Sequence, residues 1–156
     1  MGTYKIQKHP FYYLCIMFKI MLTLVFACML QSSTMTDTQV FTVHISNVSQ
    51  GKGQVMVALF SNEKVFLGTA TYADKKSSAG NELTFKFRIP EGAYAISVFQ
   101  DMNNNGKLDK NWTGIPSEPI GFGNNYKPFG PPSFEKSKVT YTAAKNTTSI
   151  KLYTIF

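Results

Sequence analysis

Short segments in which every second residue is apolar constrain the fold of this chain most. Residues 83–89 read LTFKFRI, with apolar side chains at every odd position. Residues 41–45 (FTVHI) and 94–98 (YAISV) place apolar residues on one side in the same way. Because successive side chains of a strand point to opposite faces, this alternation predicts half-buried β-strands.

Further segments complete an all-β pattern. The aliphatic run Gln54–Phe60 predicts a strand covered on both sides, and short strands are predicted at 69–73, 138–141 and 148–153. The turn signal Gln50–Gly53 predicts a hairpin that joins strand 39–48 to strand 54–60. No amphipathic helix pattern is found in the sequence. The predicted fold is an antiparallel β-sandwich of about seven strands.

The amino-terminal part of the chain has the order of a secretory signal peptide. Three lysines precede or interrupt apolar residues, and an apolar run at 20–30 is followed by small polar residues at 31–34. We predict a leader at residues 1–35, translated from Met1 or Met17, and one exported domain at residues 36–156. The domain is expected in the periplasm, cell envelope or extracellular space, with no membrane span in the mature form. Lipid attachment at Cys28 is a second outcome for the leader.

Charge and cysteine usage exclude several functions for the mature domain. Both cysteines, Cys15 and Cys28, precede residue 36, so the domain has no disulfide, thiol nucleophile or thiolate metal site. The formal charge falls from +7 to +4 when the leader lysines Lys5, Lys8 and Lys19 are removed. The remaining lysines are scattered and form no basic stripe, so nucleic acid is not an expected partner.

A long connection, Asp101–Phe134, has neither strand nor helix periodicity, and its aromatic content indicates an ordered loop within residues 101–136. It opens as DMNNNGKLD, which is the beginning of an EF-hand type calcium loop. Short oxygen-bearing side chains on alternate residues can all point into a tight curl, and Gly106 permits the turn. The predicted calcium ligands are Asp101, Asn103, Asn105, the Lys107 carbonyl and Asp109.

The calcium motif is incomplete, which leaves a second interpretation open. Trp112 stands where an EF-hand has a bidentate Glu, and no helices are predicted on either side. The alternative is a metal-free loop in which Asp and Asn side chains bond the local backbone.

Other residues carry weaker signals. His44 lacks the companion ligands of a zinc site and is interpreted as a surface residue. Asp101, Asp109 and Glu118 could serve as the carboxylates of a hydrolase, although Asn-rich spacing suits ion coordination better. The aromatic residues Trp112, Phe122 and Tyr126 could form a ligand surface for a sugar, or alternatively the small core of the loop itself.

Several longer segments carry a family resemblance. The stretch GAYAISVFQDMNNNGKLDKNWTGIPSEPIGFGNN, the later FGPPSFEKSKVTY and the opening TVHISNVSQGKGQVMVALF together resemble the bacterial family called domain of unknown function 2141. The resemblance covers nearly all of residues 38–152. It implies an exported β-sandwich of the transthyretin-like or prealbumin-like kind, with no established activity.

The expected function is that of a non-enzymatic accessory or binding module with a calcium-stabilised loop. Its partner would be an unknown protein or glycan at the cell envelope. An envelope-associated hydrolase that uses the loop carboxylates is the second class, and a purely structural or adhesion protein is the third.

Overall fold

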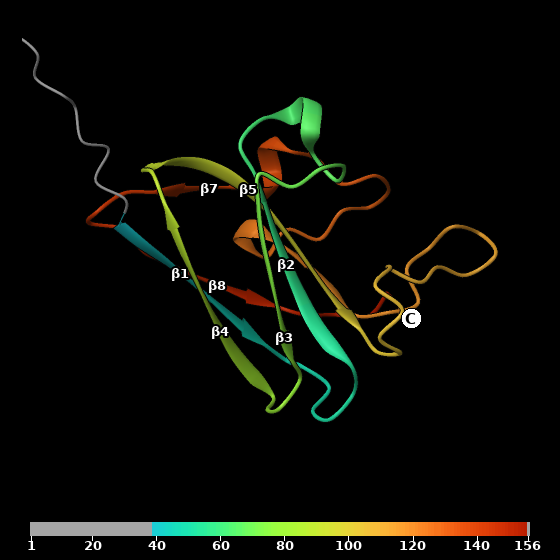
Figure 1. Cartoon of the computed structure of the whole chain (residues 1–156). Helices are drawn as coiled ribbons and strands as arrows, with labels where there is room; N and C mark the ends of the chain where they lie inside the picture. Colours follow the sequence, from blue (N-terminus) through green and yellow to red (C-terminus); the bar gives the residue numbers. More distant parts are fainter. Residues whose placement is uncertain (1–38, 156) are drawn as a thin grey trace, which may run out of the picture. The chain divides into compact units, whose positions relative to one another are not determined.

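The computed structural model describes residues 39–155 (Figure 1). This part of the chain contains strands and one-turn 3-10 helices (η), and no α-helix. The predicted leader, with Cys28 and both start sites, lies outside the described residues. The elements are β1 (Gln39–Ser46), β2 (Gln54–Phe60), η1 (Glu63–Val65), β3 (Tyr72–Ser77), β4 (Glu82–Ile89), β5 (Gly92–Asp101), β6 (Ile120–Phe122), η2 (Gly123–Asn125), η3 (Glu135–Ser137), β7 (Lys138–Tyr141) and β8 (Thr147–Lys151).

The strands form two sheets, which confirms the predicted β-sandwich. One sheet has three strands in the order β4-β1-β8, and the other has the order β3-β2-β5-β6, with β7 also paired to β5. All pairs are antiparallel except β1 and β8, which run parallel. The eighth strand is β6, which lies inside the predicted loop and is too short to show periodicity in the sequence.

The core lies between the sheets and is built by the alternation read from the sequence. Phe85 and Phe87 on β4 are 0% and 6% exposed, whereas Lys86 between them is exposed. Phe41 and Val43 on β1 stand opposite these phenylalanines in the register and are fully buried. Inward side chains of β2, β5, β7 and β8 complete one cluster. Burial of this apolar area is the main term that stabilises the sandwich.

The hairpin predicted between the first two strands is wrong. β1 and β2 belong to different sheets, so the segment that joins them crosses from one layer to the other. A turn signal shows only that the chain reverses, whereas both strands have an apolar face to bury against one shared core. The crossing is held by the buried side chain of Gln100, which donates to the carbonyls of Ser49 (2.8 Å) and Lys52 (2.6 Å).

A smaller apolar cluster covers one end of the outer face of the five-stranded sheet. Phe60 and Ala95 on this face pack with Phe134 and with Phe66 from the segment after η1. The centroid of the Phe66 ring lies 5.4 Å from that of Phe60 and 5.7 Å from that of Phe134. The rest of that outer face is only partly covered, because Met56 on β2 is half-buried rather than enclosed.

The long loop leaves the sandwich where β5 ends. Figure 1 shows it in gold and orange, projecting beyond the end of β5 before the chain returns as β6. β6 pairs with β5 through Ser97↔Phe122 and Phe99↔Ile120, which anchors the returning part of the loop to the sheet. Within residues 39–155, no helix has the length and apolar character needed to cross a membrane.

Candidate functional site

Asp101 is the last residue of β5 and is completely buried. In the register it faces Gln54 of β2, whose side chain donates to Oδ2 of Asp101 at 3.0 Å. Gly53 makes this approach possible, because a Cβ at that position would lie 1.8 Å from the Asp101 carbonyl oxygen. The sheet therefore supplies one hydrogen bond to this carboxylate, through Gln54.

The residues after Asp101 curl around its carboxylate. Oδ1 accepts the N–H of Asn105 at 3.0 Å and Oδ2 accepts the N–H of Gly106 at 2.8 Å. The curl requires positive φ at Asn104 (60°) and Gly106 (77°), conformations that Asn and Gly tolerate. The sequence-predicted turn at Gly106 is thus confirmed.

The remaining predicted ligands of the curl gather around Asp109. The side-chain amides of Asn103 and Asn105 donate to the two Asp109 oxygens at 2.7 and 2.9 Å. Their own side-chain oxygens accept backbone N–H groups, Asn103 from Asn105 at 3.0 Å and Asn105 from Lys107 at 2.8 Å. All five predicted calcium residues therefore belong to one hydrogen-bonded cluster.

Glu118 has a role in this cluster that the sequence did not reveal. Its side chain is buried, and its two oxygens accept the N–H of Met102 (2.7 Å) and the N–H of Asp109 (3.0 Å). It therefore joins the beginning and the end of the curl. The contacts span 16 and 9 residues, so no local spacing could have predicted them.

The electrostatics of the cluster are unusual because its buried carboxylates have no cationic partner. Within residues 39–155 the one ion pair joins Lys138 to Glu135. Burial raises the pKa of Asp101, but hydrogen bonds from Gln54 and from backbone N–H groups of the curl outweigh it, so the net pKa lies below the usual value of 3.8. Asp101 is thus a buried carboxylate that stays charged at neutral pH. Buried charges in proteins are generally paired or bound to a metal.

The side chains of the cluster present oxygen atoms and no sulfur or imidazole nitrogen. Among residues 39–155, no three His, Cys, Asp or Glu side chains gather in a way that could hold a metal ion. A metal here would depend on Asn and carbonyl oxygens beside Asp101 and Asp109, and calcium accepts such ligands. His44 lies elsewhere, on the three-stranded sheet, where its Nδ1 is 3.0 Å from the Thr84 hydroxyl.

A mostly apolar groove of about 870 Å³ lies beside the cluster. Its lining includes Leu108 within the curl, Lys110 directly after the curl, and residues 128–132. Its floor includes Phe99 of β5 and Phe122 of β6. This volume is within the range of small-molecule pockets, and the lining has the mainly apolar character that such pockets show.

One protein-family model covers most of the described residues. The family model DUF2141, described as an uncharacterized protein conserved in bacteria, matches residues 43–150. The chain belongs to this family. No curated protein and no solved structure matches it. The DUF2141 match runs from β1 to β8 and includes the whole of the Asp101 loop, so the curl and all the lining residues of the groove except Ile155 lie inside the match.

The aromatic residues of this DUF2141 loop have different surroundings. Phe122 is buried, and the Tyr126 ring packs against it with 6.4 Å between centroids. Trp112 is 95% exposed, so the interpretation of Trp112 as part of a loop core is wrong. Phe129, which the sequence analysis did not single out, is fully exposed. Its place between Pro128 and Gly130 was the available signal, because proline and glycine mark loops.

Proposed function

We propose that the mature chain is an exported, non-enzymatic β-sandwich binding module whose Asp101–Asp109 curl binds one calcium ion. The ligands would be the side-chain oxygens of Asp101, Asn103, Asn105 and Asp109 together with the Lys107 carbonyl. The ion would fix the curl at the end of β5. The fixed curl would in turn set the shape of the neighbouring groove.

The observation that carries this proposal is the buried, charged carboxylate of Asp101. It is 0% exposed, its pKa is lowered, and no Lys or Arg within residues 39–155 pairs with it. A divalent cation would neutralise both Asp101 and Asp109. The backbone hydrogen bonds to Asp101 could stay, because each carboxylate oxygen has two lone pairs. At Asp109 the ion would replace the side-chain amides of Asn103 and Asn105. Calcium suits the irregular oxygen set better than magnesium, which requires a smaller octahedral cage.

The link between the curl and the groove follows from chain connectivity. Leu108 lies directly between the curl residue Lys107 and the ligand Asp109, and Leu108 lines the groove. Lys110 follows Asp109 and lines the groove as well. Any ion that orders residues 101–109 would also restrict these two side chains. Calcium is therefore expected to act as a structural organiser of the binding surface.

A binding role is better supported than the hydrolase alternative. Both oxygens of Asp101 and both oxygens of Glu118 accept hydrogen bonds that hold the curl. A general acid requires a carboxyl with a raised pKa in an apolar pocket, and the pKa of Asp101 is shifted in the opposite direction. The leader sequence supports export, and the bound partner would be a component of the cell envelope.

Thermal unfolding with chelator and with millimolar calcium tests the proposal. Two carboxylates without a bidentate Glu imply a Kd of about 10⁻⁴–10⁻³ M, the range of extracellular calcium modules. At about ten times this Kd, calcium would add roughly 1.4 kcal/mol of stability. For a domain of this size, that increase raises the unfolding midpoint by about 5 °C.

Matched aspartate variants make this test specific. Asp101→Asn should remove the calcium-dependent rise in midpoint, whatever its effect on stability in chelator. Asp74→Asn, at an exposed aspartate on β3, should retain the full rise. Equal midpoints with chelator and with calcium in the unmodified protein would show that the curl is a metal-free loop.

A further inference from the structure

Three exposed apolar side chains line the groove, and the exposed Trp112 lies in a loop that contributes to its lining. Leu67, Phe129 and Ile155 line it, and Trp112 lies in the loop between the lining residues Lys110 and Thr113. Within residues 39–155 the fifth exposed large apolar residue is Val40, on β1. Exposed apolar residues scattered singly need no explanation, whereas a group of four around one groove marks an interaction surface. We call Leu67, Trp112, Phe129 and Ile155 the apolar rim.

Trp112 is presented by an ordered loop. The side-chain oxygen of Asn111 accepts the N–H groups of Thr113 and Ile115, each at 3.0 Å, and the hydroxyl of Thr113 at 2.6 Å. The N–H of Asn111 donates to the Ile115 carbonyl at 2.8 Å, and Lys110 bridges to Pro116. The loop therefore holds a tryptophan that is 95% exposed at its outer end.

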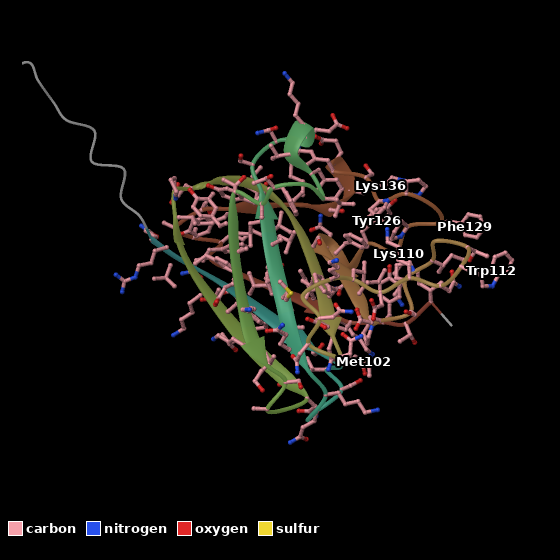
Figure 2. All side chains as sticks on the ribbon, turned by 45° about the vertical axis from the view of Figure 1, so that its right-hand side comes forward. Met102, Lys110, Trp112, Tyr126, Phe129 and Lys136 are labelled. Atoms are coloured by element: carbon pink, nitrogen blue, oxygen red, sulfur yellow. The ribbon has the colours of Figure 1, made fainter. Side chains whose placement is uncertain are left out.

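Phe129 lies in a second loop, residues 127–132, which is rich in proline. Pro128, Pro131 and Pro132 restrict the backbone around it, and Gly130 takes a φ of 113°. Figure 2 shows Trp112 and Phe129 at the outer ends of neighbouring loops, both directed away from the sandwich. Because hydrogen bonds hold the Trp112 loop and prolines restrict the Phe129 loop, burial of these two rings would cost little additional backbone entropy.

The exposed charge beside the apolar rim is positive. Lys107, Lys110 and Lys127 lie on the same two loops, and none of them forms an ion pair with a described residue. The carboxylates of this region, Asp101, Asp109 and Glu118, are buried or half-buried around the curl, so the charged groups that reach the surface are the lysines. The surface thus combines protruding aromatic rings with exposed lysines that form no ion pair, a combination that suits the interface of an anionic bilayer.

We propose that this surface docks on the face of a bilayer that contains anionic phospholipid. Trp112 and Phe129 enter the headgroup region, and the lysines approach the lipid phosphates. Two protruding tips on separate loops fit a fluid medium, which can close around each ring. A second copy of this chain is disfavoured, because a shared interface would bring its lysines against those of the first. The inference rests on the proposed function of the protein as a binding module, and it does not require calcium.

The expected losses follow from general transfer values. Removing one apolar ring from the interface should weaken binding to vesicles roughly tenfold. Removing one lysine near the anionic surface should weaken it about fivefold. Binding to vesicles without anionic lipid should fall by more than one lysine accounts for, because all three lysines lose their partner.

The sole tryptophan of the chain is Trp112, so its fluorescence reports the contact directly. Protein isolated after removal of the leader is mixed with vesicles of phosphatidylglycerol and phosphatidylcholine, some carrying brominated acyl chains. The emission of Trp112 is expected to shift to shorter wavelength and to be quenched by the bromine. Quenching is specific for an inserted Trp112, so a contact made elsewhere on the protein would not produce it.

Phe129→Ser should weaken binding to anionic vesicles roughly tenfold, and Lys110→Gln should weaken it about fivefold. Val40→Ser and Lys86→Gln, which alter an exposed apolar residue and an exposed lysine of the three-stranded sheet, should leave it unchanged. An unshifted Trp112 with anionic vesicles, equal binding to pure phosphatidylcholine, or full binding by Phe129→Ser would each overturn the proposal. A shift of the Trp112 emission on addition of a soluble envelope protein, with no shift on addition of vesicles, would also overturn it. Vesicle titrations in chelator separate this result from the calcium result, which is read from the unfolding midpoint without lipid.

Discussion

Replacing Glu118 with Gln tests whether this buried carboxylate closes the curl. Glu118 accepts the N–H of Met102 at 2.7 Å and that of Asp109 at 3.0 Å. A glutamine keeps one acceptor oxygen but turns an amide NH₂ toward the other backbone donor. Hydrogen bonds to charged groups contribute about 1.5–3 kcal/mol each, and a buried unpaired donor costs a similar amount. We expect Glu118→Gln to lower the free energy of unfolding by about 2–4 kcal/mol.

The assay is urea unfolding followed by far-ultraviolet circular dichroism. Tryptophan fluorescence is unsuitable, because Trp112 is already exposed in the folded protein. Glu82→Gln, at an exposed glutamate on β4, is the matched control and should change stability by less than about 0.5 kcal/mol. Hydrogen exchange at the amides of Met102 and Asp109 should accelerate only in Glu118→Gln. Equal urea midpoints for the two variants would refute the reasoning.

Three further predictions concern the core, the pH response and the leader. Phe85→Ala should cost about 3–5 kcal/mol through lost burial and a cavity, whereas Lys86→Ala should cost less than about 0.5 kcal/mol in the same urea experiment. The lowered pKa of Asp101 stabilises the fold fully above the unfolded value near 3.8, and this contribution is lost as pH falls through the folded pKa. Melting curves at decreasing pH should therefore lose stability below about pH 4, and less steeply in Asp101→Asn. Mass spectrometry of the envelope protein should find an amino terminus between residues 28 and 37, whereas intact protein starting at Met1 would contradict export.

The sequence predicted the sandwich well where local pattern and burial agree. The alternation at residues 83–89 placed Phe85 and Phe87 in the core and Lys86 outside it, as the structure shows. It could not predict which sheet each strand joins, because turn residues at 50–53 describe only a local reversal. The parallel pairing of β1 with β8 also depends on contacts between distant residues.

The sequence predicted the candidate site only in part, because some of its contacts also join residues that are distant in the sequence. The spacing of Asp101, Asn103, Asn105 and Asp109 predicted a curl, and the structure brings these residues together. The clamp by Glu118 is nonlocal and left no pattern. Trp112 was misread because large aromatic residues are usually buried, whereas here an Asn111-centred loop holds the ring outward.

Calcium titration by isothermal calorimetry tests the central claim most directly. The unmodified protein should bind one calcium ion with a Kd of about 10⁻⁴–10⁻³ M, and magnesium should give much weaker heats. Asp101→Asn should show no binding heat, while Asp74→Asn should match the unmodified protein. No calcium heat from the unmodified protein, or the same heat from Asp101→Asn, would contradict a calcium site in the curl.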